Sequence, residues 1–173
     1  MKRDTLGKVG VIFIVILLYG CASRGAIKET TPMTLKLSTY KTMLLNISSQ
    51  VAGSSEEIVQ LETVTISKIR GKGLFDKVIS GSSSPNAQAD LRLNAKIIQL
   101  KRVSPGARVM VGAMAGRAGI DVEVEFFDLK ESKSIGTFIA QGRSSGGTAF
   151  AGTTPQAVER AAEQIVEFIQ KNM

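Results

Sequence analysis

The clearest pattern in the chain is the alternation of apolar and polar side chains over residues 89–103. Leu91, Leu93, Ala95 and Ile97 occupy every second position, which predicts a strand with one buried face. The alternation slips by one residue after Ile97, and a β-bulge at this point would keep the same face buried. The alternative interpretation is a strand end that is buried on both faces.

A second strand with the same alternation carries the opposite charge on its polar side. It covers residues 120–126, and its polar positions are acidic: Asp121, Glu123 and Glu125. The strand at 89–103 presents Arg92 and Lys96 instead. Opposite charges on one face favour cross-strand pairs, so the two strands are predicted to be antiparallel neighbours. The alternative is that the three carboxylates form a metal or acid–base site.

Helical spacing predicts two helices. In the first, Ser54 and Glu57 match a capping box, and Gly71 is expected to end the helix. Its apolar face carries Ile58, Leu61, Thr65 and Ile69. The basic residues near its end favour the negative end of the helix dipole, an interpretation that we prefer to a binding patch. They are Lys68, Arg70 and Lys72.

The second helix occupies the C-terminal end of the chain. Thr154 is its predicted N-cap, and Pro155 takes its first helical position. A wide apolar stripe then predicts a helix that covers a sheet. This stripe contains Val158, Ala161, Ala162, Ile165, Phe168 and Ile169.

Three further segments, at 40–51, 75–80 and 135–143, have the composition and spacing of strands. The predicted order is therefore β-α-β-β-β-β-α. Such an order predicts an α+β fold in which two helices cover one face of a mixed, largely antiparallel sheet. We expect residues 35–173 to form this single domain.

The start of the chain has the layout of an export signal. Lys2, Arg3 and Lys8 precede an almost unbroken apolar run over residues 9–19. That run is too short to span a bilayer, which needs about 20 residues. The alternative is a short N-terminal anchor that is never cleaved. We therefore predict a signal peptide over residues 1–20.

The end of this segment, Leu18-Tyr19-Gly20-Cys21, resembles the lipobox of bacterial lipoproteins. The resemblance implies cleavage between Gly20 and Cys21, diacylglycerol on the Cys21 sulfur and acylation of the new amino group. Tyr19 departs from the usual pattern, which places a small residue there. Ala22 follows, and the resemblance then implies sorting to the outer membrane with the domain in the periplasm. Residues 21–34 are mixed and polar, and we expect a lipidated N-terminus and tether.

Composition excludes much of the usual catalytic equipment. The chain has no His and a single Cys, so it lacks a histidine base, a disulfide and a thiolate metal site. The formal net charge is +7, which is typical of a soluble domain and also suits anionic surfaces. Aromatic residues are only 5%, which argues against a stacking platform for nucleic acid. We expect no metal, no cofactor and no nucleic-acid partner.

A glycine-rich segment covers residues 104–119 and includes Gly112, Gly116, Arg117 and Gly119. The phosphate-loop and dinucleotide-binding glycine patterns are absent from it. The favoured interpretation is a long connection between strands. The alternative is a loop that touches lipid or a small ligand.

Several motifs together resemble a bacterial lipoprotein family known as domain of unknown function 4410. They are residues 70–75 (RGKGLF), 89–93 (ADLRL), 111–116 (VGAMAG), 142–147 (GRSSGG) and 157–165 (AVERAAEQI). The resemblance implies a cell-envelope lipoprotein and carries no catalytic residues with it.

The leading functional hypothesis is a lipid-anchored, non-enzymatic accessory protein that binds another envelope protein. The second is a lipid or small-ligand binder that uses residues 104–119. The third is an enzyme that uses the carboxylates of Asp121, Glu123 or Glu125.

Overall fold

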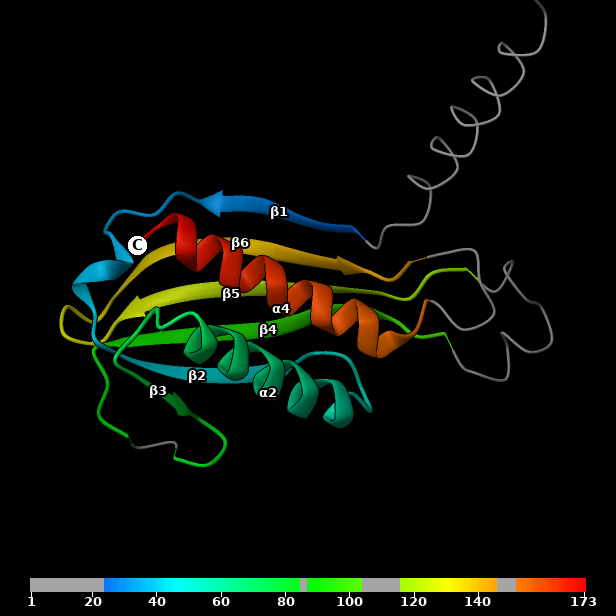
Figure 1. Ribbon diagram of the computed structural model, residues 1–173, viewed down its shortest axis with the longest axis horizontal. Helices are drawn as coiled ribbons and strands as arrows, with labels where there is room; N and C mark the ends of the chain where they lie inside the picture. Colours follow the sequence, from blue (N-terminus) through cyan, green and yellow to red (C-terminus); the bar gives the residue numbers. More distant parts are fainter. Residues whose placement is uncertain (1–23, 85–86, 104–115, 146–151) are drawn as a thin grey trace, which may run out of the picture.

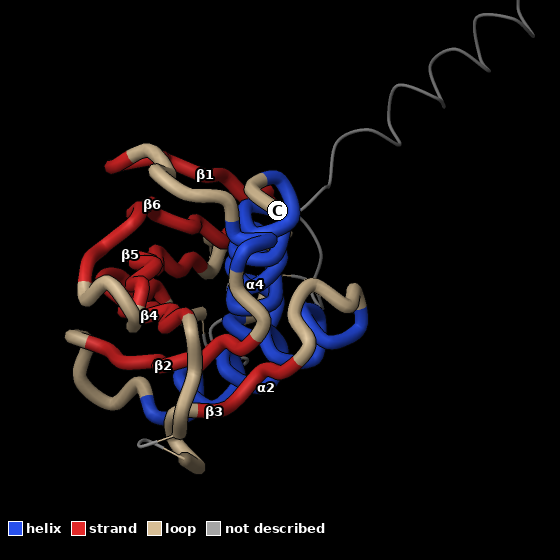
Figure 2. Tube along the Cα trace, turned by 90° about the vertical axis from the view of Figure 1, so that its left-hand side faces the viewer, coloured by secondary structure: helices blue, strands red, loops and turns tan. Residues whose placement is uncertain are grey.

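The computed structural model describes residues 24–84, 87–103, 116–145 and 152–173. They form a six-stranded sheet with two long helices on one face (Figures 1 and 2). The strands are β1 (Arg24–Thr31), β2 (Thr42–Ser49), β3 (Lys77–Ser80), β4 (Leu91–Lys101), β5 (Gly119–Asp128) and β6 (Lys133–Arg143). The helices are α2 (Ser55–Gly71) and α4 (Thr154–Lys171), with a short 3-10 helix, η1 (Leu37–Thr39), before β2.

The sheet is mixed, with strand order β1-β6-β5-β4-β2-β3. β1, β6, β5 and β4 are antiparallel neighbours, whereas β2 is parallel to both β4 and β3. A parallel pair needs a crossover connection, and α2 supplies it between β2 and β3. The predicted α+β class, with two helices on one face of a mixed sheet, is confirmed.

The predicted neighbours β4 and β5 are antiparallel, and their polar side chains lie opposite one another on the same face of the sheet. Lys96 lies opposite Glu123, and Asn94 lies opposite Glu125. The register shifts between Ile97 and Gln99, so the predicted bulge is confirmed at its predicted place. Leu91, Leu93, Ala95 and Ile97 are fully buried on the helix side of the sheet, and beyond the bulge Leu100 packs against the same core.

The core lies between the sheet and the helices. Three phenylalanine rings stack at its centre, with ring centroids 6.0 Å apart for Phe126 and Phe138 and 3.9 Å apart for Phe138 and Phe168. The apolar stripe predicted for α4 is buried throughout. Gly142 allows α4 to approach β6 closely, because a Cβ atom there would lie 2.0 Å from the carbonyl oxygen of Ala157.

The predicted caps of α2 are wrong in detail. Ser54 is the N-cap residue, but its hydroxyl donates to the carbonyl oxygen of Val51 at 2.7 Å instead of accepting from the helix. Glu57 binds Arg102 and does not complete a capping box. At the other end, Gly71 is the last helical residue and Gly73, with φ +60°, takes the left-handed conformation. From the sequence alone, either Gly71 or Gly73 could be the glycine that ends the helix, and only the positive φ angle identifies Gly73.

The buried face of α2 was predicted correctly at three of its four positions. Leu61, Thr65 and Ile69 are buried, whereas Ile58 is only partly buried.

The N-cap of α4 lies one residue before the predicted position. Thr153, not Thr154, is the N-cap, and its hydroxyl accepts from the backbone N–H of Gln156. Two consecutive threonines before Pro155 make the sequence signal ambiguous by one position.

Residues 24–31 form an edge strand, so the expected irregular tether over residues 21–34 is wrong for this part. β1 pairs with β6 from Arg24, opposite Arg143, to Thr31, opposite Thr137. Gly25 lets it lie against α4, since a Cβ atom there would be 2.5 Å from the side chain of Gln164. The sequence gives no periodic signal because residues 25–31 are all exposed. Cys21, Gly20 and the predicted signal peptide lie outside the described residues.

Candidate functional site

The sheet has one uncovered face, opposite the helices (Figure 2). We call it the open face and define it by the alternate residues of β4, β5 and β6 that point away from the core. They are Arg92, Asn94, Lys96, Asp121, Glu123, Glu125, Phe127, Thr137, Ile139 and Gln141. The face is a continuous polar surface with apolar side chains of intermediate burial set into it.

Cross-strand contacts hold two of the three acidic side chains that the sequence singled out. Asp121 forms an ion pair with Arg143 at 2.5 Å and accepts from the side-chain amide of Gln141 at 3.1 Å. Glu125 accepts from the amide of Asn94 at 3.0 Å. Asp121 is buried and Glu125 half-buried, and these contacts use the carboxylates as partners in the sheet, which supports a structural role over an acid–base site.

A metal site on β5 finds no support in the part of the chain that the structure describes. Nowhere in that part do three His, Cys, Asp or Glu side chains lie close enough together to hold a metal ion. Asp121, Glu123 and Glu125 share one face, as predicted, but are spread along the strand.

Arg92 and Phe127 form a cation–π pair at one end of the open face. The guanidinium carbon of Arg92 lies 4.6 Å from the centroid of the Phe127 ring. The pair places a flat, partly apolar surface beside the charged rows of Lys96 and Glu123. Aromatic and arginine side chains are enriched at protein-binding surfaces, although lysine and glutamate are not.

The sequence reasoning missed a buried carboxylate near the start of α2. Glu57 is only 6% exposed, and Arg102 donates to its two oxygens at 2.7 and 2.9 Å. These bonds hold the pKa of Glu57 below its usual range. Arg102 also donates to the carbonyl oxygen of Gly53 at 2.7 Å, so it ties the end of β4 to the turn before α2. A charged residue just beyond a strand is a weak signal, because most such residues are solvated.

A second missed carboxylate, Glu62, accepts from serine hydroxyls of the β3 end. Ser80 donates to it at 2.8 Å and Ser82 at 2.7 Å. The group lines a hollow of about 500 Å³ that opens to solvent. The hydroxyls satisfy the acceptors of a carboxylate that would otherwise be buried unpaired, so their role is structural.

The basic cluster at the end of α2 joins the two helices. Lys68 lies 3.2 Å from Glu163 and 3.5 Å from Glu159, and Lys72 donates to the side chain of Gln170 at 2.8 Å. The pKa of Glu163 is lowered, with burial opposing the bonds from Arg160 and Lys68. The basic residues therefore hold α2 against α4, a role that the interaction with the helix dipole did not predict.

The predicted glycine loop is only partly described. Gly112 lies outside the described residues, whereas Gly116, Arg117 and Gly119 lie within them. Gly116 has φ +82°, Arg117 is exposed, and Gly119 is the buried first residue of β5 against Arg143. The described part therefore forms the end of the connection and the start of a strand.

These elements define the class of the protein: a two-layer α+β domain with one sheet face open. A family model matches residues 48–148, which is more than half of the chain. The chain therefore belongs to the family described as Domain of unknown function (DUF4410), and the resemblance stated from the motifs is confirmed. No curated protein matches the chain.

Solved structures share the fold at low sequence identity. The chain is similar to PelC from Paraburkholderia phytofirmans, described as a dodecamer, with 17% identity, a TM-score of 0.54 and coverage of 83% of this chain and 96% of that one. A point variant of the same dodecamer gives 15% identity and the same TM-score of 0.54, covering 83% and 95%. Protein XCC0632 from Xanthomonas campestris gives 10% identity and a TM-score of 0.47 over 81% and 85%. The likeness to PelC extends to the fold alone.

In residues 24–84, 87–103, 116–145 and 152–173, no helix is long and apolar enough to cross a membrane.

Proposed function

We propose that the protein is a lipid-anchored accessory protein of the cell envelope, without catalytic activity of its own, that binds another envelope protein. The anchor is diacylglycerol on Cys21, and the location is the periplasmic side of the outer membrane. The open face of the sheet is the surface that receives the partner.

The observation that carries this proposal is the position of β1. The strand begins at Arg24, three residues after the Cys21 that ends the signal-like leader. A folded domain that starts directly behind the lipobox-like segment fits a mature lipoprotein, in which the chain begins at the lipidated cysteine. A lipid anchor with two or three chains gives lasting membrane residence, which one chain does not.

The open face supports the second half of the proposal. Its basic and acidic side chains lie opposite each other on neighbouring strands, as Lys96 and Glu123 do, and the Arg92–Phe127 pair lies at one end of the open face. Mixed charge of this kind favours a specific partner of complementary pattern over a uniformly charged polymer. Helices α2 and α4 cover the other face, so that face is unavailable.

The proposal is tested first on the anchor. Mass spectrometry of the N-terminal peptide from cells should show diacylglycerol and an acyl chain on Cys21, and Cys21→Ser should abolish both. Density fractionation should place the protein in the outer membrane. Ala22→Asp should move it to the inner membrane, whereas the matched variant Ala22→Ser should leave it in place.

The partner is tested by crosslinking in living cells followed by affinity capture. We expect one envelope protein to be captured with the wild type and not with Cys21→Ser. A lipidated protein that captures no partner above background would leave the accessory role without support. Weight would then move to the lipid or small-ligand hypothesis for residues 104–119.

A further inference from the structure

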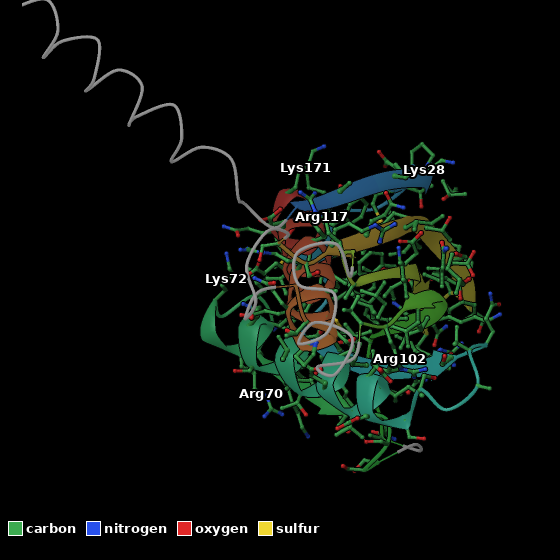
Figure 3. All side chains as sticks on the ribbon, turned by 90° about the vertical axis from the view of Figure 1, so that its right-hand side faces the viewer. Lys28, Arg70, Lys72, Arg102, Arg117 and Lys171 are labelled. Atoms are coloured by element: carbon green, nitrogen blue, oxygen red, sulfur yellow. The ribbon has the colours of Figure 1, made fainter. Side chains whose placement is uncertain are left out.

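The strand register gathers a particular set of residues at one end of the sheet. Arg24, the first residue of β1, lies opposite Arg143, the last residue of β6, and Arg143 also lies opposite Gly119. Gly119 in turn lies opposite Lys101, the last residue of β4. We call this the anchor-proximal end and define it by Lys101, Arg102, Arg117 and Arg143, of which Arg102 and Arg117 are labelled in Figure 3. Both long helices also begin here (Figure 1).

The link between this end and Cys21 is short. Two residues separate Cys21 from Arg24, so three Cα–Cα steps, or at most about 11 Å of chain, join them. β1 is held at this position by its pairing with β6 and by the packing of Gly25 against Gln164. A lipid on Cys21 therefore holds this end of the domain close to the head groups.

Charge at the anchor-proximal end suits an anionic surface. Arg102 pairs with Glu57 and Arg143 with Asp121. Lys101 and Arg117 are exposed, and neither forms an ion pair with a described residue. Glu56, in the first turn of α2, is a further acidic side chain at this end.

The two helix N-termini add to this positive field. Each carries the equivalent of about half a positive charge, and both α2 and α4 point theirs toward this end. Attraction to an anionic membrane acts over about 8 Å at physiological ionic strength, and the link of at most about 11 Å keeps the start of β1 at a comparable distance from the head groups.

We infer that the anchor-proximal end rests on the anionic head-group surface of the membrane that holds the anchor, with Lys101 and Arg117 in contact with lipid phosphates. The sheet then stands away from the membrane. Its far end, at the β5–β6 turn, lies about 35 Å farther out, because β6 has 11 residues. The open face is left accessible to a partner in the periplasm. This inference rests on lipidation of Cys21 as proposed above.

A single introduced thiol can measure this orientation. The chain has one Cys, and its sulfur is blocked in the lipidated protein, so Ala52→Cys or Ser38→Cys supplies the only free thiol. Both positions are small and exposed, Ala52 in the turn before α2 and Ser38 in η1 at the far end. Each variant is labelled with a fluorophore and reconstituted in vesicles of phosphatidylethanolamine and phosphatidylglycerol. Some of the lipids carry a quencher at the head group.

We expect the label at position 52 to be quenched at least twice as strongly as the label at position 38. Adding Lys101→Glu and Arg117→Glu should bring this ratio toward one. The matched far-end pair Lys41→Glu and Lys130→Glu, with the same change in charge, should leave the ratio unchanged. Circular dichroism checks that each variant is folded.

Equal quenching at the two positions, or a ratio that the near-end reversals do not alter, would overturn the inference and leave the proposed function intact. Protein that carries no lipid and does not float with the vesicles would overturn the proposed function, and the inference with it. Quenching that depends on the anchor but is the same in vesicles of phosphatidylcholine alone would overturn the role of the anionic surface.

Discussion

The two faces of the sheet differ in the interactions that their side chains make. On the covered face, side chains such as Phe126 and Phe138 are fully buried and pack against α4 with no polar partner. On the open face, Asn94 and Glu125 bind each other across strands, and Lys96 is exposed. Buried apolar area is the main stabilising term in a fold, whereas exposed pairs contribute little. The covered face therefore maintains the structure, and the open face is free to vary for recognition.

The largest expected effect is at the centre of the covered face. Phe138→Ala removes one ring of the three-ring cluster, the ring 3.9 Å from Phe168, and should destabilise the protein by about 3–5 kcal/mol. Phe127→Ala, on the open face, should cost only about 1 kcal/mol, since it removes the contact with Arg92 and little buried area. Urea denaturation of both variants measures the difference. Similar losses in the two variants would contradict the assignment of stability to the covered face.

A substitution at the contact between α4 and β6 should destabilise the protein nearly as much as the loss of Phe138. Gly142→Val places a Cβ atom where the backbone of Ala157 and Ala161 already lies, so it should cost about 2–3 kcal/mol. Gly71→Ala is the matched control, because no atom lies within 4 Å of its Cβ position. That variant should stabilise α2 by up to about 1 kcal/mol. Thermal unfolding separates the two results, and tolerance of valine at 142 would show that α4 can move away.

The ion pair of Glu57 and Arg102 should make a pH-dependent contribution of intermediate size to the free energy of unfolding. The pKa of Glu57 is lower in the folded chain than its ordinary value of 4.5, so the charged form stabilises the fold above that pH. This contribution is lost as the pH falls through the lowered folded value. Glu57→Gln should cost about 1–2 kcal/mol at neutral pH and less at an acid pH below 4.5, where the carboxyl of Glu57 becomes protonated.

Urea titrations of wild type and Glu57→Gln at the two pH values check this expectation. Glu56→Gln is the control, because Glu56 is exposed and makes no ion pair with a described residue. A cost of Glu57→Gln that is the same at both pH values would contradict a role for the ionised pair.

The smallest expected effect is on the open face. A double-mutant cycle on Lys96→Ala and Glu123→Ala should give a coupling energy of about 0.5 kcal/mol or less. High salt should reduce it further. A coupling above about 2 kcal/mol, measured by urea denaturation, would show that the open face is structural and not free for recognition.

The two faces also explain what the sequence could predict. Alternation identified β4, β5 and the bulge after Ile97, because a buried face imposes a period of two on the sequence. It missed β1, whose exposed residues are held by backbone hydrogen bonds that carry no side-chain signal. The buried Glu57 was missed for a related reason. Its partner Arg102 is 45 positions away, and only the fold brings the two together.

The candidate site was predictable only in part. The open face followed from the alternating charges of β4 and β5, but the cation–π pair of Arg92 and Phe127 depends on register. The anchor-proximal end needed both the strand order and the finding that β1 begins at Arg24. Neither could be read from local spacing.

The most direct test of the account is to ask which face touches the partner in the cell. A photo-crosslinking amino acid is placed either at Lys96, on the open face, or at Val59, which is 62% exposed on α2. In cells with Cys21 intact, we predict a covalent adduct of one discrete mass from position 96 and none from position 59. Adducts from position 59 alone, or of equal yield from both positions, would contradict the assignment of the open face to the partner.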